Sequence, residues 1–374
     1  MKGPRSLHII SSLGLASGGP PQSVTKLCEA LGRRGAPAEI ATLDWSQENA
    51  RAGPVPVHSF PVGHPRRLRR SPALRQFLVD VGASFDVFHV HGLWEWVGVH
   101  AAAASRSLGV PLVVSPRGML EPWSLRQRPW VKQFALRTFQ GRIFRAASLL
   151  HATAAPEADG FRNLLPRMPV LVVPNGVEIP VVIARPASSR TLLFLSRYHQ
   201  KKGIDRLLRA WDSVWRNFPE WTLELRGPDP DGLRPGLQEL ARGLGLPPAR
   251  TILGDAAYGA DRDALLARGA LFVLPTESEN FGNVIAEALA VGLPVITTTG
   301  TPWAGLHEHR CGWWVAPTQQ SIEVALREAL SLPPRLLEEM GTRGRAWVQA
   351  RFSWDAVAQT MVDGYRSLPP RQLK

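Results

Sequence analysis

Residues 271–287 read LFVLPTESENFGNVIAE, and this stretch decides the fold prediction. Leu271–Leu274 is a short apolar run that predicts a buried strand, and a helical stretch begins between Glu279 and Glu287. In an open α/β sheet, ligands bind outside the carboxyl ends of the strands, where helix N-termini present unpaired N–H groups and partial positive charge. Two carboxylates at such an edge suit a polyhydroxylated, negatively charged ligand.

The chain is long enough for two domains, with 374 residues of which 44% are hydrophobic and 20% charged. Apolar runs alternate with helical segments, which predicts an α/β fold of two doubly wound, Rossmann-like domains. The predicted strands are Leu7–Ile10, Ala38–Ala41, Val87–Val90, Leu112–Val114, Thr191–Leu195, Trp221–Leu225, Leu271–Leu274 and Pro294–Thr297.

The strand and helix pattern restarts after Val170–Val177, which places a domain boundary there. We expect an N-terminal acceptor-binding domain over residues 1–176 and a C-terminal nucleotide-sugar-binding domain over 177–352, with a Pro/Ala/Ser-rich linker at Ile179–Ser189. The last segment, 353–374, predicts a helix that packs back on the N-terminal domain. It carries Trp354, Val357, Met361 and Tyr365 on one face.

Composition disfavours several classes of protein. No run of eighteen apolar residues occurs, and the N-terminus lacks a signal-peptide pattern, so we expect a cytoplasmic protein. The two cysteines, Cys28 and Cys311, lack metal-ligand spacing and predict reduced thiols. The pair Asp229 and Asp231 mimics a DxD metal motif, but it follows Gly227 in the wrong context, and we expect no metal site.

The formal net charge of +13 is concentrated in the N-terminal half, where residues 1–180 hold 21 Lys and Arg against 11 Asp and Glu. Basic and aromatic residues alternate between Arg117 and Arg145, including Trp130, Lys132 and Phe134. This mixture suits an anionic inner-leaflet membrane surface. A solvated basic face or contact with nucleic acid would give the same pattern, although no nucleic-acid-binding motif occurs.

Two further segments place phosphate-binding residues at strand ends. Gly18 and Gly19 follow the first strand, where glycine allows close approach of a phosphate or sugar. Arg197 and Lys202 follow the first strand of the second domain and could neutralise a diphosphate from two directions. The glycines do not form GxGxxG, which disfavours a nicotinamide enzyme.

Together these residues resemble the retaining, nucleotide-sugar-dependent glycosyltransferases of family 4, which have the GT-B architecture of two facing Rossmann-like domains with an interdomain cleft. The resemblance covers nearly the whole chain, and a subset of its motifs resembles bacterial surface-polysaccharide transferases. The family resemblance rests on Gly18-Gly19, 86–92, 174–177, Arg197 with Lys202-Gly203, Gly227-Pro228, 279–287, 292–296 and 352–354. The resemblance to surface-polysaccharide transferases rests on 115–123 and 301–303.

The resemblance implies a role for each matching residue of the second domain. Glu287 would bind the ribose hydroxyls and Glu279 a hydroxyl of the donor sugar. Arg197 and Lys202 would hold the diphosphate and stabilise its charge as it leaves. The backbone N–H groups of three consecutive residues would meet the remaining sugar hydroxyls: Phe281, Gly282 and Asn283.

In the N-terminal domain, Gly19 would close over the phosphates. Many relatives place a histidine where this chain has Arg117, and this departure leaves acceptor phosphate and donor sugar as alternative contacts of Arg117. His91 ends a strand and is a candidate sugar or acceptor contact, whereas His89 is expected to be buried.

The predicted function is transfer of a sugar from a UDP- or GDP-sugar to a lipid-linked or saccharide acceptor in exopolysaccharide or lipopolysaccharide assembly. The resemblance implies retention of configuration without a metal or other cofactor. The basic N-terminal half favours a place at the inner leaflet, where polyprenyl-diphosphate-linked acceptors lie, and a glycan is the other expected acceptor. Alternatives are a nucleotide-sugar 2-epimerase or hydrolase on the same fold and a basic nucleic-acid-binding protein; we expect no nucleic-acid partner.

Overall fold

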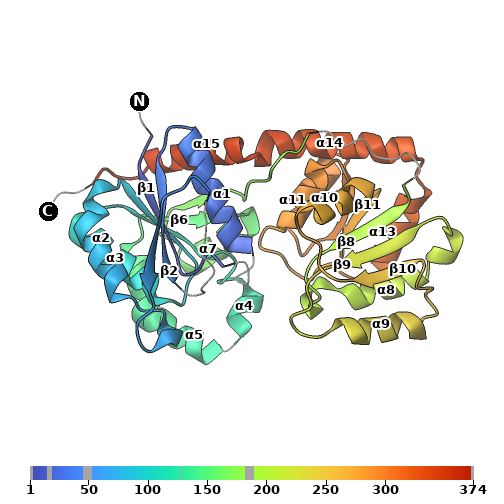
Figure 1. Ribbon diagram of the computed structural model, residues 1–374, viewed down its shortest axis with the longest axis horizontal. Helices are drawn as coiled ribbons and strands as arrows, with labels where there is room; N and C mark the ends of the chain where they lie inside the picture. The colour runs from blue at the N-terminus through green and yellow to red at the C-terminus, as the bar shows by residue number, and fades with distance from the viewer. Residues whose placement is uncertain (1–2, 15–18, 45–52, 128, 182–188, 372–374) are drawn as a thin grey trace. The chain divides into compact units, whose positions relative to one another are not determined.

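The computed structural model describes residues 3–14, 19–44, 53–127, 129–181 and 189–371. The chain divides into two compact units: unit 1 comprises Met1–Gly176 and Trp354–Lys374, and unit 2 comprises Val177–Ser353. Each unit is a parallel sheet with helices on both faces, so the prediction of two Rossmann-like domains is confirmed (Figure 1).

Unit 1 contains a seven-stranded parallel sheet in the order β3-β2-β1-β4-β5-β6-β7. Its strands are β1 (Ser6–Ile10), β2 (Ala38–Asp44), β3 (Val57–Pro61), β4 (Val87–His91), β5 (Leu112–Ser115), β6 (Leu149–Ala152) and β7 (Val170–Val172). Its α-helices are α1 (Gly19–Arg33), α2 (Pro72–Val81), α3 (Trp96–Leu108), α4 (Pro122–Arg126), α5 (Pro129–Ala135), α6 (Gly141–Ala146), α7 (Ala155–Leu164) and α15 (Trp354–Arg366). It also has the 3₁₀ turns η2 (Arg66–Leu68) and η3 (Gly82–Ser84) and the π-helical segment η4 (Leu136–Gln140).

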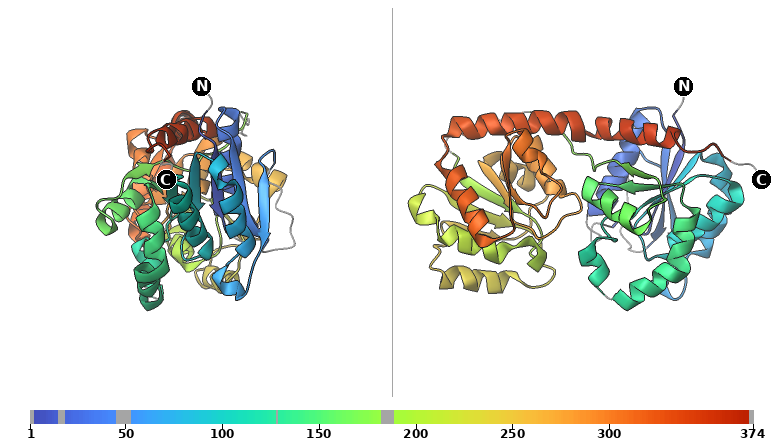
Figure 2. Two further views of the ribbon diagram at one scale, coloured as in Figure 1. Left: turned by 90° about the vertical axis from the view of Figure 1, so that its left-hand side faces the viewer. Right: turned by 180° about the vertical axis from the view of Figure 1, so that it is seen from behind.

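Two apolar clusters cover the two faces of this sheet. One includes Leu78, Val97 and Phe161 from α2, α3 and α7, and the other includes Leu27 of α1 and Met361 of α15. Helix α15 lies beside α1, and Figure 2 shows helices on both sides of the sheet. Because helices cover both apolar faces of the sheet, a ligand site is expected at the carboxyl ends of the strands.

Unit 2 contains a six-stranded parallel sheet in the order β10-β9-β8-β11-β12-β13. Its strands are β8 (Thr191–Leu195), β9 (Thr222–Arg226), β10 (Thr251–Gly254), β11 (Leu271–Leu274), β12 (Val295–Thr298) and β13 (Gly312–Val315). Its helices are α8 (Ile204–Asp212), α9 (Arg234–Gly243), α10 (Gly259–Arg268), α11 (Asn283–Ala290), α12 (Gly305–Glu308), α13 (Gln319–Ser331) and α14 (Pro334–Phe352), with 3₁₀ turns η5 (Gln200–Lys202) and η6 (Trp215–Asn217).

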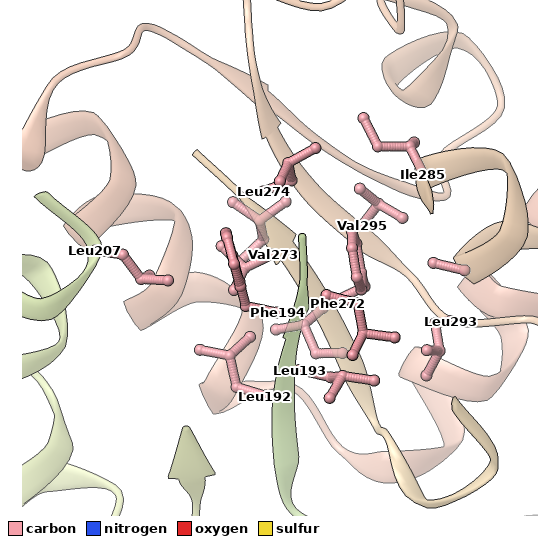
Figure 3. Packing of buried hydrophobic residues seen from close by; sticks show 14 of the residues in the cluster. Leu192, Leu193, Phe194, Leu207, Phe272, Val273, Leu274, Ile285, Leu293 and Val295 are labelled. Atoms are coloured by element: carbon pink, nitrogen blue, oxygen red, sulfur yellow. The ribbon is translucent and has the colours of Figure 1, made fainter. Parts of the chain in front are cut away.

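The core of unit 2 is a single apolar cluster built on β8 and β11. Leu193 of β8 is in register with Phe272 of β11, and both side chains are fully buried (Figure 3). Near-continuous apolar strands of this kind are expected where both faces of a parallel sheet are covered. Within the described part of the chain, no helix is long and apolar enough to span a bilayer.

Candidate functional site

The candidate site of unit 2 lies at the point where the strand order reverses. Strands β8 and β11 are neighbours in the centre of the sheet, and the chain leaves them in opposite directions. Such a switch point leaves a crevice at the carboxyl ends of the strands. Arg197 follows β8 and is exposed, Lys202 lies on η5 after the same strand, and Glu279 follows β11.

Lys202 and Glu279 form an ion pair across this switch point. The ammonium group of Lys202 donates to Glu279 Oε1, and the two side chains are only 11% and 15% exposed. Removing one partner of a buried pair typically costs about 3–5 kcal/mol, because the other charge stays desolvated. Gly203, directly after Lys202, has a φ of 65° and leaves no room for a Cβ atom, which would lie 2.3 Å from the Pro275 carbonyl oxygen.

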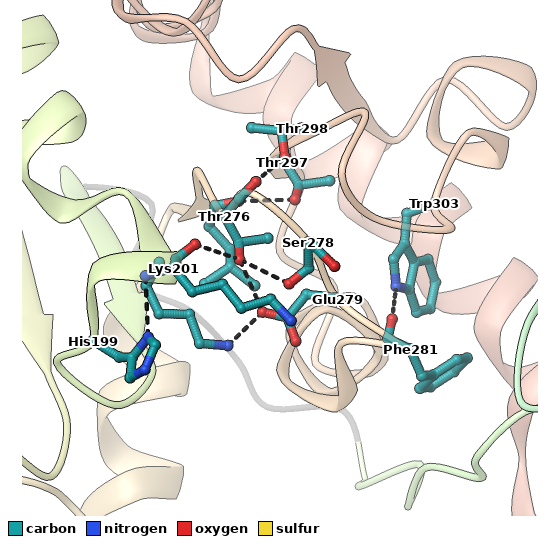
Figure 4. A network of polar contacts seen from close by, with 11 residues as sticks. His199, Lys201, Thr276, Ser278, Glu279, Phe281, Thr297, Thr298 and Trp303 are labelled. Atoms are coloured by element: carbon teal, nitrogen blue, oxygen red, sulfur yellow. Dashed lines mark hydrogen bonds and ion pairs between the residues drawn. The ribbon is translucent and has the colours of Figure 1, made fainter. Parts of the chain in front are cut away.

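Polar contacts join the loops that carry the pair, and Figure 4 shows those that Thr276 makes with Lys201 and Glu279. The Glu277 N–H donates to the Lys201 carbonyl oxygen at 2.8 Å, and the Glu279 N–H donates to the Gly300 carbonyl oxygen at 2.8 Å. Thr276 Oγ1 lies 3.0 Å from the Lys201 carbonyl oxygen and 3.1 Å from Glu279 Oε1. The loops after β8, β11 and β12 therefore hold one another in a fixed arrangement around the carboxylate.

Trp303 packs against Phe281, just before the N-terminus of α11. The indole N–H of Trp303 donates to the Phe281 carbonyl oxygen at 2.6 Å, and the two rings are in contact. Gly282 has a φ of 82° and turns the chain into the helix, whose first residue is Asn283. The start of α11 thereby presents backbone N–H groups and the positive end of the helix dipole at the same edge as Lys202.

Glu287 lies one turn further along α11 and pairs with Arg262 of α10. Both side chains are about 30% exposed, at 29% for Glu287 and 30% for Arg262. Each of the two carboxylates predicted to bind a donor thus has a cation beside it, Lys202 for Glu279 and Arg262 for Glu287.

In unit 1, Arg117 lies just beyond the carboxyl end of β5 in an unusual backbone conformation. Its φ of 57° is in the left-handed region, and the adjoining turn is held by Glu157, whose Oε1 accepts from the Gly118 N–H at 2.6 Å. Its Nη1 donates to Asn175 Oδ1 at 2.7 Å and to Ser23 Oγ at 3.2 Å. Such strain is maintained only where surrounding structure enforces it.

The guanidinium group of Arg117 also contacts His91 at the end of β4. Arg117 Nη2 lies 3.1 Å from His91 Nδ1, and His91 Nε2 lies 2.9 Å from His8 Nδ1. Burial lowers the pKa of Arg117 to about 10 and, together with His89 and Arg117, holds the pKa of His91 well below its usual range. The Nε of Arg117 is buried and has no hydrogen-bond partner within the described residues.

Comparison with known proteins gives two family matches and several similar proteins. Residues 18–176 match a glycosyl transferase 4-like domain, and residues 189–331 match the glycosyl transferases group 1. The D-inositol 3-phosphate glycosyltransferase of Thermobispora bispora is 30% identical over 322 residues, which cover 75% of this chain and 70% of that protein.

The chain belongs to the family 4 glycosyltransferases. Among its relatives is the GDP-mannose:cellobiosyl-diphosphopolyprenol alpha-mannosyltransferase of Xanthomonas oryzae, 25% identical over 337 residues that cover 87% of each chain. Anabaena Alr3699/HepE, solved in complex with UDP, shares the GT-B fold with a TM-score of 0.78 at 20% identity, over 97% of this chain and 100% of that one.

As a family 4 glycosyltransferase, the chain has its predicted donor residues on one edge of the unit 2 sheet. Lys202 and Glu279 are in contact, and Phe281, Gly282 and Asn283 follow in the same loop and helix start. In unit 1, Gly19 begins α1, and Gly18 lies outside the described residues. The ligand contacts expected of all these residues stay predictions.

His91 has a different setting from the one expected of a direct sugar contact. It is buried like His89, and both of its ring nitrogens are bonded within the protein, to His8 and Arg117. Direct contact of His91 with a substrate stays a prediction. Any influence of this ring on a ligand in the arrangement seen here would pass through Arg117.

The DxD-like segment has a structural role. The Asp229 carboxylate accepts from the N–H groups of Leu233 and Arg234 at 2.7 and 3.0 Å, at the start of α9. Asp231 Oδ2 lies 4.0 Å from His199 Nε2. Asp229 therefore satisfies backbone donors at a helix start, which is a common use of aspartate.

Three residues with a structural part in these sites were missed at the sequence level. Arg262 pairs with Glu287, Trp303 bonds the Phe281 carbonyl, and Asn175 accepts from Arg117. Trp303 and Asn175 lie in segments that carried the family resemblance, and their position there was the available signal. Arg262 lies in an ordinary amphipathic helix and gave no signal.

Proposed function

We propose that this glycosyltransferase transfers one sugar, with retention of configuration and without a metal ion, from a UDP- or GDP-sugar to a lipid-linked or saccharide acceptor. The pathway is assembly of an exopolysaccharide or lipopolysaccharide. The observation that carries the proposal is the Lys202–Glu279 pair at the switch point of unit 2, with Glu287 on helix α11, which follows Glu279.

Each charged group of unit 2 has a role that its chemistry suits. The ionised carboxylate of Glu287 can accept two hydrogen bonds from the vicinal ribose hydroxyls, and Glu279 accepts one from the donor sugar. Lys202 and Arg197 supply positive charge to the diphosphate. Because that charge grows as the sugar departs, these two cations stabilise the transition state more than the ground state.

The reaction proceeds by attack of an acceptor hydroxyl on the anomeric carbon from the face that the diphosphate leaves. The bond from the anomeric carbon to the phosphate oxygen breaks, the bond to the acceptor oxygen forms, and the hydroxyl proton passes to a diphosphate oxygen. Glu279 acts here as a hydrogen-bond acceptor rather than as a nucleophile. Paired cations take the part that a divalent ion plays in other transferases.

A lipid-linked acceptor is supported by the surface of α5. Trp130, Val131 and Phe134 are 83%, 64% and 68% exposed, and Lys132 lies among them. Exposed aromatic and basic side chains on one short helix suit the headgroup region of an anionic bilayer. The Xanthomonas oryzae relative is named for a diphosphopolyprenol acceptor, which agrees with this assignment.

The donor part of the proposal is tested by ligand stabilisation followed by transfer. UDP, GDP and their sugars are screened for a rise in melting temperature, and the best donor is incubated with a polyprenyl-diphosphate-linked saccharide. We expect Glu287→Ala and Lys202→Ala to lose donor-dependent transfer. Wild-type transfer by both variants would overturn the proposal, and epimerised or hydrolysed donor in an acceptor-free incubation would favour the alternative enzyme.

The membrane part is tested separately with the paired variant Trp130→Ser and Phe134→Ser. Sedimentation with vesicles of phosphatidylglycerol and phosphatidylcholine should fall severalfold, since two exposed aromatic side chains no longer enter the headgroup region. Val324→Ser, at a residue 60% exposed on α13 of unit 2, is the matched control. Equal sedimentation of wild type and the paired variant would contradict the membrane assignment.

A further inference from the structure

A continuous chain of polar side chains runs through the core of unit 1, from Arg117 after β5 to the residue that follows β7. It passes from Arg117 to His91, His8, Tyr365, His89 and His151 and ends at the Val173 carbonyl oxygen. Arg117 Nη2 lies 3.1 Å from His91 Nδ1, and His91 Nε2 lies 2.9 Å from His8 Nδ1. The Tyr365 hydroxyl lies 3.3 Å from His8 Nε2 and 2.7 Å from His89 Nδ1. His89 Nε2 lies 3.2 Å from His151 Nδ1, and His151 Nε2 lies 2.8 Å from the Val173 carbonyl oxygen.

The two ends of this chain fix its direction. A guanidinium group can only donate, so His91 Nδ1 accepts and His91 Nε2 carries the proton that is donated to His8. A carbonyl oxygen can only accept, so His151 Nε2 carries a proton and His151 Nδ1 accepts from His89. The Tyr365 hydroxyl closes the chain between these halves, because it accepts from His8 and donates to His89.

All four histidines are therefore neutral and share one tautomer, with the proton on Nε2. The surroundings favour neutrality, since burial and the nearby Arg117 lower the pKa of His8 to about 3, and burial and Arg117 lower the pKa of His151 to about 3. Every link then has one donor and one acceptor, and His8 Nε2 also lies 3.2 Å from Ser6 Oγ. A network in which every histidine ring nitrogen has a partner specifies one orientation for each ring.

A metal site is the other arrangement that clustered histidines suggest. His8, His89 and His91 each offer a ring nitrogen within 4.8 Å of the others. All six nitrogens of these three rings, however, are already engaged by protein partners, and one of the partners is the cation Arg117. A bound cation would have to break several of these bonds beside a positive charge, so the hydrogen-bonded chain accounts for the cluster better.

We propose that His91, His8 and Tyr365 are positioning residues that hold the Arg117 guanidinium in one orientation, so that the C-terminal helix α15 helps to set the substrate contact of unit 1. The inference rests on the proposed function for the part that Arg117 plays in binding phosphate or sugar. Tyr365 lies on α15 and Arg117 beyond β5, and His91 and His8 join them.

The test uses Tyr365→Phe in the full-length protein, a change that removes one hydroxyl group and keeps the ring. Val357→Ala on the same helix is the control, because Val357 is buried in the apolar cluster that holds α15 and carries no polar side-chain atom. Both variants should lower the melting temperature. Only Tyr365→Phe should lower kcat/KM, by about tenfold, as expected when a binding group is misplaced by a fraction of an ångström to an ångström.

Nuclear magnetic resonance of protein labelled with ¹⁵N in its histidine and arginine side chains gives a readout that does not depend on activity. In the wild type we expect four neutral Nε2–H histidines and slow rotation of the Arg117 guanidinium, and in Tyr365→Phe we expect faster rotation. A neutral Nδ1–H tautomer in any of the four would overturn the chain direction. Unchanged guanidinium rotation in Tyr365→Phe would overturn the positioning role, whether or not transfer activity is found.

Discussion

The two sheets differ most at the same place in the fold, their two central strands. In unit 1, His8 of β1 is in register with His89 of β4, and in unit 2 Leu193 of β8 is in register with Phe272 of β11. All four side chains are fully buried. One fold therefore accepts either a polar or an apolar centre, provided that every polar group finds a partner.

The two units order their central side chains in different ways. The apolar centre of unit 2 gains stability roughly in proportion to buried area, about 25 cal/mol per Å², and imposes little direction on its side chains. The polar centre of unit 1 gains little net free energy from each hydrogen bond, about 1 kcal/mol, but imposes a direction along the whole chain. Unit 1 thereby orients Arg117, whereas unit 2 fixes its charged pair through backbone contacts between loops.

The largest expected effect is acid lability confined to unit 1. The pKa values of His8 and His151 are lowered to about 3, and those of His89 and His91 are well below 6.5, chiefly by burial. Below pH 6.5 these histidines become protonated in the unfolded chain but stay neutral in folded unit 1. The free energy of unfolding of unit 1 therefore falls as the pH drops from 6.5 toward 3. Four such groups give up to about 5 kcal/mol per pH unit.

Pulse-labelling hydrogen exchange after equilibration between pH 7.5 and 4.5 measures this effect region by region. Peptides from β1, β4 and α15 should lose protection at a higher pH than peptides from β8 and β11. Loss of protection in the unit 2 strands first would contradict the contrast between the two centres.

The next effect in size is loss of catalysis in Lys202→Ala. We expect kcat to fall by about 10²–10³, because a preorganised charge beside the leaving diphosphate is removed and Glu279 is left unpaired. Arg209→Ala, at an exposed residue of α8, the helix that follows Lys202, also removes one positive charge and should leave kcat unchanged. The measurement is steady-state kcat of both variants with the best donor. An equal loss of kcat in Lys202→Ala and Arg209→Ala would show that only the net charge of unit 2 matters.

A smaller effect is expected from Trp303→Phe, which keeps an aromatic ring but removes the donor to the Phe281 carbonyl oxygen. A buried carbonyl left without its partner costs about 1–3 kcal/mol, and the start of α11 should loosen. We expect a lower melting temperature and a severalfold lower kcat/KM. Trp347→Phe, in a ring that packs on Trp303, is the control and should retain kcat/KM.

The smallest effect concerns the exposed pair Arg33 and Asp355, which joins α1 to α15 at 3.4 Å. Both side chains are more than half exposed, so Asp355→Asn should change the free energy of unfolding by less than about 1 kcal/mol. Tyr365→Phe on the same helix should cost more. Urea unfolding of the two variants compares them, and a larger loss in Asp355→Asn would mean that surface charge rather than the buried chain anchors α15.

The fold and the donor edge could be predicted because their signals are local in sequence. Leu271–Leu274 ends eight residues before Gly282, so a strand, a loop and a helix start follow one another along the chain, with Glu279 between them. Parallel pairing then brings the ends of β8 and β11 to one edge. Lys202 and Glu279 meet there although 77 positions separate them.

The polar chain of unit 1 and the Arg262–Glu287 pair could not be predicted, because they depend on contacts that no local sequence pattern encodes. His8 and Tyr365 are 357 positions apart, and their contact follows from the packing of α15 in unit 1. The sequence placed His8 and His89 inside predicted apolar strands, but it predicted no strand at His151 and did not show that Tyr365 would join the first two. The pairing of Arg262 with Glu287 is likewise a consequence of how α10 and α11 pack.

Titration calorimetry with UDP and GDP shows whether unit 2 binds a nucleotide beside Glu287. The proteins compared are wild type, Glu287→Gln and the control Glu338→Gln at an exposed position of α14. Removing a charge-assisted acceptor for the ribose hydroxyls should weaken the preferred nucleotide about tenfold or more in Glu287→Gln and leave Glu338→Gln unchanged. Equal affinity in all three proteins would contradict a nucleotide site at this edge of unit 2.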